Sequence, residues 1–309
     1  MQTPSLVLAP DPAPHLDSFQ TIYHDPSGRI RHLYLPTSPE HHMKRMLAAG
    51  FERIYQIDSF YRDGELGPLH NPEFTGLEWY EAGASMEDIM DFTEALVRHA
   101  AQTLCGGLLV SRQGHKLDLS KPFARVTVRE ALMRWAQVDV PEDWNEEALR
   151  RALVQAGYRL SPDDGFDDLV NRPLIERVEP ALEELGPAFL TDYPAPMAAL
   201  ARLRPSAPAV AERFELYIGG LELSNGYGEL NDAKEQRRRF KEQLTQRRLM
   251  GKSDVPLDEA FLQALSQGMP TAGGNALGVD RLLMLLLDKA RIEQVMAFSM
   301  VGELGWGGD

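Results

Sequence analysis

The sequence predicts an α+β fold, because strand-like and helix-like segments both recur along the chain. Residues 53–62 (RIYQIDSFYR) and 214–226 (FELYIGGLELSNG) are rich in aromatic and branched apolar residues, which is typical of strands. Residues 85–104 carry apolar side chains at helical spacing. From about residue 116 to residue 186, helical patterns follow one another with polar connections, which predicts a helical insertion inside the domain.

The first third of the chain is predicted to alternate helices and strands. A helix begins near Ser38, which can cap it, and ends at Gly50. The strand at 53–62 follows, and then a short loop leads to a second strand in the stretch HNPEFTGLEWY at 70–80. The next helix is capped by Ser85.

The remaining elements are predicted in the same way. Within the insertion, helices are expected over 127–136, 145–157 and 167–185, and a strand near 187–193. Two short strands then flank Gly219 and Gly220, a two-residue hairpin turn. Further helices are expected over 230–251, with Asn231 or Asp232 near the start, and over 258–268. At 271–288 a glycine-rich turn and a short strand lead into a nearly all-apolar, buried helix.

Composition and charge exclude several classes of protein. The 309-residue chain has a net charge of −14, which argues against broad nucleic-acid binding, and the basic run at 237–248 is interpreted as a solvated helix face. A single cysteine excludes an internal disulfide framework and any CxxC metal site. No apolar run approaches the roughly 18 residues of a membrane span, and no signal-peptide pattern is seen, so a cytoplasmic location is expected.

The stretch at 70–80 contains the first candidate site. Because side chains alternate along a strand, Phe74, Gly76, Glu78 and Tyr80 share one face. An aromatic ring, a gap, a carboxylate and a phenol would suit the floor of a ligand site. The alternative is an ordinary amphipathic strand with one solvated face.

The hairpin contains a second candidate site. With its turn at the two glycines, Glu222 lies opposite Tyr217, and Glu215 is a diagonal neighbour on the same face. Two carboxylates in this arrangement repel each other unless a cation lies between them, and Mg²⁺ favours carboxylates together with substrate phosphates. Two unrelated solvated glutamates remain the alternative. Asn225 and Glu229 follow directly in the same neighbourhood.

The third candidate is GGNALGVDRL at 273–282, where glycines allow close approach of the backbone to a ligand. Arg281 lies in the first turn of an otherwise apolar helix and needs an anionic partner. A phosphate would suit its planar fork, and an intramolecular ion pair is the alternative. The P-loop and Rossmann glycine patterns are both absent from the chain.

Together these stretches resemble the catalytic domain of class II aminoacyl-tRNA synthetases, in the lysyl branch. Residues 61–83 resemble motif 2, residues 273–285 resemble motif 3, and residues 214–236 resemble the lysine-subgroup segment between them. The resemblance runs from about Thr3 to Phe298. Within the branch the chain is most similar to the stand-alone paralogues that attach lysine or β-lysine to elongation factor P (the EpmA/PoxA/GenX family). Its motifs resemble the paralogues' sequences, and Ala276 replaces a glycine of the tRNA ligases.

The resemblance implies a fold, a reaction and partners. The fold would be one class II catalytic domain over residues 1–309, with a mixed, mostly antiparallel sheet, a helical insertion, and neither an anticodon-binding domain nor the motif 1 helix. The reaction would be ATP-dependent activation of lysine or (R)-β-lysine, with Mg²⁺, and transfer of the aminoacyl group to a lysine of elongation factor P. The family forms homodimers through the motif 1 helix; tRNA is not the expected acceptor, and no membrane is involved.

The resemblance also implies roles for individual residues. Arg62 and Arg281 would bind the α- and γ-phosphates of ATP as the catalytic arginines. The other ATP-binding residues would be His70, Asn71, Phe74 on the adenine, and Glu222. Mg²⁺ would be ligated by Glu215 and Glu222. The amino acid would be surrounded by Ser38, Glu40, Glu78, Tyr80, Asn225, Glu229 and Ala276.

Two residues depart from the motif 2 pattern, which normally reads Arg-x-Glu. Arg62 is followed by Asp63 and Gly64, so Glu65 comes one position late, and Gly76 replaces a larger residue. Two other functions therefore stay open: an adenylate-forming enzyme with tRNA or another amine as acceptor, and a non-catalytic paralogue that senses lysine or ATP.

Overall fold

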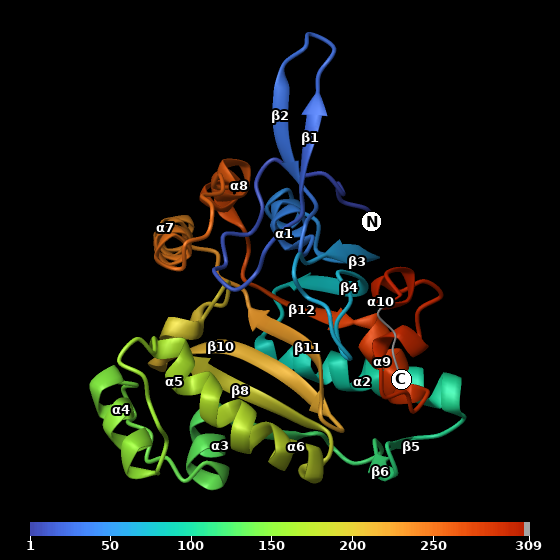
Figure 1. Cartoon of the computed structure of the whole chain (residues 1–309), viewed down its shortest axis with the longest axis vertical. Coiled ribbons are helices and arrows are strands. Elements are labelled where there is room, and N and C mark those ends of the chain that lie inside the picture. Colours follow the sequence, from blue (N-terminus) through green and yellow to red (C-terminus); the bar gives the residue numbers. More distant parts are fainter. Residues whose placement is uncertain (306–309) are drawn as a thin grey trace. The chain divides into compact units, whose positions relative to one another are not determined.

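The computed structural model describes residues 1–305, which form two compact units (Figure 1). The first unit comprises Met1–Ala84, Leu230–Met284 and the segment from Lys289 onward, and the second comprises Ser85–Glu229 and Leu285–Asp288. No helix among residues 1–305 is long and apolar enough to cross a membrane.

The first unit contains a three-stranded antiparallel arrangement in which β4 (Glu73–Ala82) is the middle strand. β3 (Arg53–Tyr61) pairs with one edge of β4 and β12 (Ala272–Gly278) with the other. These strands confirm the predictions at 53–62 and 70–80. The expected glycine-rich turn was wrong, because the glycines at 273–274 lie within β12, where Gly274 is opposite the large side chain of Tyr80.

The remaining elements of this unit surround those strands. They are the exposed hairpin β1 (Gln20–His24) and β2 (Ile30–Tyr34), and the helices α1 (Glu40–Ala48), α7 (Ala233–Leu249), α8 (Glu259–Gly268), α10 (Met300–Glu303) and a 3₁₀ turn (Ile292–Gln294). The predicted cap at Asp232 is confirmed: its side chain accepts hydrogen bonds from the first turn of α7. Ser38 lies one residue before the cap position Pro39, and its Oγ accepts from the backbone N–H of Glu40. The apolar helix α9 (Val279–Leu286) directly follows β12.

The second unit contains a mixed, mostly antiparallel sheet built around β10 (Ala207–Ile218). β10 pairs antiparallel with β11 (Leu221–Gly228) and β8 (Ala188–Pro194), and β7 (Ala124–Thr127) runs parallel to β8. The predicted turn is confirmed, since Gly219 and Gly220 both have positive φ angles, of 57° and 74°. The other elements here are α2 (Met86–Cys105), capped by Ser85 as predicted, β5 (Leu109–Arg112), β6 (His115–Asp118) and β9 (Leu203–Arg204).

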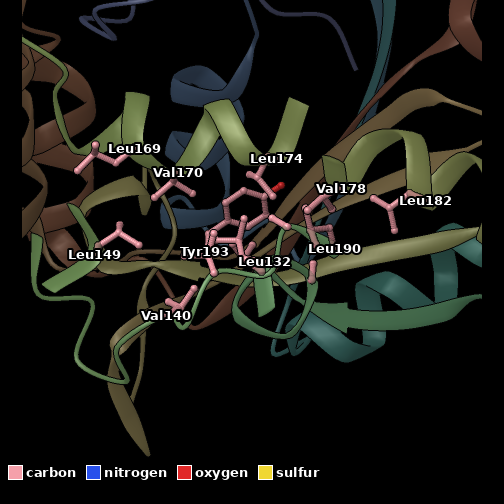
Figure 2. Close-up of a cluster of buried hydrophobic side chains, with 14 of the residues drawn as sticks. Leu132, Val140, Leu149, Leu169, Val170, Leu174, Val178, Leu182, Leu190 and Tyr193 are labelled. Atoms are coloured by element: carbon pink, nitrogen blue, oxygen red, sulfur yellow. The ribbon is translucent and has the colours of Figure 1, made fainter. Parts of the chain in front are cut away.

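The predicted helices between residues 116 and 186 are confirmed, although β6 and β7 occupy the start of that range. They are α3 (Val128–Trp135), α4 (Glu146–Gln155), α5 (Phe166–Pro173), a π-helical turn (Leu174–Val178) and α6 (Glu179–Leu185). Their apolar faces form one buried cluster with Leu190 and Tyr193 of β8 (Figure 2). This cluster fixes β8 against the helices and thereby holds the Tyr193 side chain in place.

Candidate active site

Four of the predicted amino-acid-binding residues come together in the first unit. The Ser38 hydroxyl donates to Glu78 Oε1 at 2.7 Å, and the Tyr80 hydroxyl donates to Glu78 Oε2 at 2.9 Å. Ala276 of β12 lies directly opposite Glu78 of β4. Glu78 and Tyr80 are both buried, so the prediction that they share one face of a strand is confirmed, and that face is not solvated.

Glu40 contributes a second carboxylate and is joined by a residue that the sequence reasoning missed. Lys44 is fully buried, and its Nζ lies 2.5 Å from Glu40 Oε1. The two residues are four apart on α1, a spacing that could have indicated the pair. Burial and the charge of Glu40 raise the pKa of Glu78 to about 7, against the lowering effects of Ser38, Tyr80 and Lys44. Glu78 therefore gains or loses its proton near neutral pH.

A pocket opens beside these residues in the first unit. It is lined by Ser38 and Glu40 and also by Asp11, His41 and Asp258. His41 Nδ1 lies 3.4 Å from Asp258 Oδ2. Burial lowers the pKa of His41, but the hydrogen bond to Asp258 and the nearby carboxyl groups outweigh this effect, so the pKa is raised. The lining is thus rich in carboxylates, which would suit a cationic ligand.

A second group in the first unit combines the two predicted catalytic arginines with His70 and Phe74. The guanidinium carbon of Arg62 lies 5.0 Å from the centre of the Phe74 ring. Arg281 Nη2 lies 2.6 Å from His70 Nε2. Burial and the Arg281 charge lower the pKa of His70, so a neutral imidazole accepts the hydrogen bond from Arg281. Arg62 Nε is buried without a hydrogen-bond partner, as expected for a donor that awaits an anion.

Glu65, one position late for the motif 2 pattern, reaches this group. Its Oε2 lies 3.5 Å from Arg62 Nη1 and 4.0 Å from His70 Nε2. The turn at Gly64, with a φ of 81°, lies between Arg62 and Glu65 in the chain. A carboxylate is therefore present beside Arg62 despite the shifted spacing.

Steric crowding explains why glycine is present at position 76. A Cβ atom at this position would lie 2.7 Å from the Phe60 side chain, closer than side chains approach each other. The Phe60 ring fills the space and lies 6.3 Å from the Phe74 ring, centre to centre. Gly76 thus lets Phe60 support the aromatic ring that is predicted to lie on adenine.

Asn71 makes contacts of a different kind. Its Nδ2 donates to the Glu73 carbonyl at 2.6 Å, and its Oδ1 accepts from the Met300 N–H at 2.8 Å. Both ends of this buried side-chain amide are hydrogen-bonded to backbone groups, so its role in ATP binding stays a prediction. Asp280, which the sequence reasoning missed, similarly accepts from the Thr75 N–H at 2.7 Å.

The second unit carries the remaining predicted residues, and Glu215 is at the centre of a buried network there. Its Oε2 accepts from the hydroxyls of Tyr193 at 2.5 Å and Tyr217 at 2.8 Å. Its Oε1 accepts from Arg213 Nη2 at 2.6 Å and from Asn225 Nδ2 at 3.3 Å. The sequence reasoning brought Glu215 and Asn225 together but missed Arg213 and Tyr193.

Glu222 lies opposite Tyr217, as predicted, and is half-buried. The predicted diagonal pairing of Glu215 with Glu222 was wrong, because a bulge between Leu216 and Tyr217 shifts the register and places Glu215 opposite Asn225. Among residues 1–305 no group of three or more His, Cys, Asp or Glu side chains is arranged to hold a metal. Two carboxylates on one hairpin still fit Mg²⁺ that takes its other ligands from phosphate and water. Glu229 is completely buried, directly follows β11 and forms an isolated bridge with Ala201.

Comparison with known proteins shows the family of this chain. Residues 1–302 match the family described as tRNA synthetases class II (D, K and N). The chain is 40% identical over 267 residues to the lysine–tRNA ligase of Aromatoleum aromaticum, covering 86% of this chain and 53% of that protein. Identity to the lysine–tRNA ligase of Dehalococcoides mccartyi is 38% over 266 residues, covering 86% and 53%.

The lysine–tRNA ligase of Magnetococcus marinus is 38% identical over 276 residues, covering 88% of this chain and 54% of that protein. The chain therefore spans about half the length of the curated relatives that it matches. The predicted fold class is confirmed by the family match and by the mostly antiparallel strands flanked by helices. The chain belongs to the class II tRNA synthetases of the D, K and N group.

Proposed function

We propose that this protein uses ATP to activate lysine or (R)-β-lysine as an aminoacyl-adenylate and transfers it to a lysine side chain of elongation factor P. The observation that carries the first half is the buried carboxylate Glu78, held by Ser38 and Tyr80 beside the second carboxylate Glu40. A substrate with two amino groups needs such acceptors, because a buried ammonium is stable only when it is paired.

The first unit supplies donors for the phosphates of ATP. Arg62 has a buried Nε without a partner, and Arg281 can exchange its bond to neutral His70 for a bond to a phosphate oxygen. The amino-acid carboxylate would attack the α-phosphorus in line and pyrophosphate would leave. The arginines would stabilise the negative charge of the transition state.

In the second unit, Glu215 and Glu222 would hold Mg²⁺, which would neutralise phosphate charge when bound. Asn225 would donate to the amino-acid carboxylate, and Glu229 would contribute a further buried carboxylate. In the second step a neutral amine of the acceptor would attack the carbonyl carbon of the adenylate, the bond between that carbon and the phosphate oxygen would break, and an amide, AMP and one proton would result. Positioning of the two reactants is sufficient for this chemistry, since no covalent enzyme intermediate is needed.

The choice of acceptor is supported by the resemblance of the motifs, and the choice of amino acid by Ala276. Its position opposite Glu78 would place a methyl group against the bound amino acid, where the resemblance implies a glycine in the tRNA ligases. One methyl group in a packed pocket changes the ranking of substrates by about 1–3 kcal/mol. This supports a preference for an amino acid whose amino group is shifted, such as (R)-β-lysine.

A second candidate acceptor is tRNA, because the curated relatives at about 40% identity are named lysine–tRNA ligases. The two acceptors can be compared directly. The protein is incubated with ATP, Mg²⁺ and either lysine isomer, together with elongation factor P or with lysine-specific tRNA. We expect intact-mass analysis to show one added lysyl group on elongation factor P and no aminoacylation of tRNA. Aminoacylated tRNA with unmodified elongation factor P would overturn the choice of acceptor.

A further inference from the structure

The carboxylate of Glu215 has no acceptor position left for another ligand. An ionised carboxylate offers about four lone-pair positions on its two oxygens. Tyr193 and Tyr217 occupy both positions on Oε2, and Arg213 and Asn225 occupy both on Oε1. A metal ion can therefore reach Glu215 only when one of these donors leaves.

Arg213 is the one cation among the four donors. Its Nη2 lies 2.6 Å from Oε1, and both side chains are largely buried, with 15% of Arg213 and 11% of Glu215 exposed. By contrast, the Asn225 bond to the same oxygen is long, at 3.3 Å. A buried carboxylate needs a compensating positive charge, and Arg213 supplies it.

The surroundings of Arg213 define where its guanidinium rests. Nη1 donates to the Met197 carbonyl at 2.8 Å, and the guanidinium carbon lies 4.3 Å from the centre of the Tyr193 ring. Nε is buried without a hydrogen-bond partner. The guanidinium is thus held by the Tyr193 face and one carbonyl as well as by Glu215, so it keeps two contacts when the contact with Oε1 is lost.

We propose that Arg213 occupies the cation position on Glu215 and keeps its affinity for free divalent metal low. This inference rests on the proposed Mg²⁺ site at Glu215 and Glu222. A divalent ion arriving alone must compete with a buried guanidinium for Oε1. An ion that arrives on nucleotide phosphates brings most of its ligands with it and needs to exchange little water to bind Glu215, so the competition then favours the metal. Arg213 is in this sense a positioning residue, which holds the Glu215 carboxylate ready and prevents metal binding without nucleotide.

The test measures binding of Mn²⁺, as a paramagnetic substitute for Mg²⁺, to the full chain by electron paramagnetic resonance without nucleotide. Arg213→Gln removes the charge, and we expect it to bind Mn²⁺ about tenfold or more tightly than the unmodified protein. Arg213→Lys keeps the charge and should bind Mn²⁺ as weakly as the unmodified protein. The double variant R213Q/E215Q should lose the gain, because the carboxylate that becomes available is then missing.

The chain offers a matched control in Arg202. It forms an ion pair with Glu212 in the same unit, with Nη2 2.6 Å from Oε2. Arg202→Gln removes the same charge from a neighbouring part of the sheet and should leave Mn²⁺ affinity unchanged. A gain of equal size in this control would mean that net charge, and not the contact with Glu215, controls the metal, and would overturn the inference.

Two further results would contradict the proposed role of Arg213. The first is an Arg213→Gln variant that is folded by circular dichroism but binds Mn²⁺ no more tightly than the unmodified protein. The second is tight Mn²⁺ binding by the unmodified protein without nucleotide, which is informative even if the variant does not fold. Both readouts are separate from catalysis: absence of lysine-dependent ATP–pyrophosphate exchange would instead contradict the proposed function.

Discussion

Replacing Glu78 with glutamine tests whether burial raises the pKa of this carboxyl group. In the folded protein the pKa of Glu78 is raised from its ordinary value of 4.5 to about 7, first by burial and then by Glu40. A raised pKa means that the folded state holds the proton more tightly than the unfolded state. The contribution to stability is therefore fully present below pH 4.5 and is lost as the pH rises through about 7.

The size of the effect follows from the shift. A shift of about 2.5 units corresponds to about 3 kcal/mol, at about 1.4 kcal/mol per unit. The glutamine does not titrate, so the variant should be more stable than the unmodified protein at about pH 8 by about 2–3 kcal/mol and similar to it at about pH 5. The lower figure allows for one weakened hydrogen bond to the Ser38 or Tyr80 hydroxyl, worth about 1 kcal/mol.

The assay is urea denaturation of both proteins at the two pH values, followed by circular dichroism. Glu73→Gln is the matched control, because this exposed residue lies on the same strand. Stability curves of the unmodified protein and the Glu78 variant that run parallel between the two pH values would refute the reasoning. The same substitution should weaken binding of lysine in calorimetry, since the carboxylate for its ammonium is lost.

Three other substitutions have definite expected outcomes. Gly76→Ala should lower the free energy of unfolding by about 1–3 kcal/mol in urea denaturation, because its methyl group would lie 2.7 Å from Phe60; an unchanged midpoint would mean that Phe60 has room to move. Arg281→Gln should raise the KM for ATP about tenfold or more in pyrophosphate exchange, whereas a KM equal to that of the unmodified protein would mean that Arg281 serves only its contacts within the protein, such as those with His70 and the Leu69 carbonyl. Ala276→Gly should shift the ratio of kcat/KM for α-lysine over (R)-β-lysine upward by about tenfold, and an unchanged ratio would remove Ala276 from substrate selection.

Much of the fold could be predicted because local signals agree with the tertiary structure. Gly219 and Gly220 can adopt positive φ at no steric cost, so the hairpin and the pairing of Tyr217 with Glu222 followed from the turn. Alternation along β4 was sufficient to bring Glu78 and Tyr80 to one face. The glycines of β12 were wrongly predicted to form a turn, because their pairing with β4 outweighs the poor strand propensity of glycine.

The parts of the candidate site that could not be predicted depend on contacts between distant segments. Tyr193 donates to Glu215 although 22 residues separate them, and no local pattern indicates this bond. Arg213 precedes Glu215 by two positions on one strand, which indicates a shared face but not an ion pair. The pKa of Glu78 likewise depends on burial, which alternation alone does not measure.

The central claim is that this chain forms an aminoacyl-adenylate from a lysine isomer and ATP. It is tested most directly by ATP–pyrophosphate exchange with α-lysine, with (R)-β-lysine and without amino acid. We expect exchange that requires an amino acid, is faster with (R)-β-lysine, and is lost in the Glu215→Gln variant. Exchange at background level with both isomers, from protein that is folded by circular dichroism, would contradict it and favour a paralogue that only senses lysine or ATP.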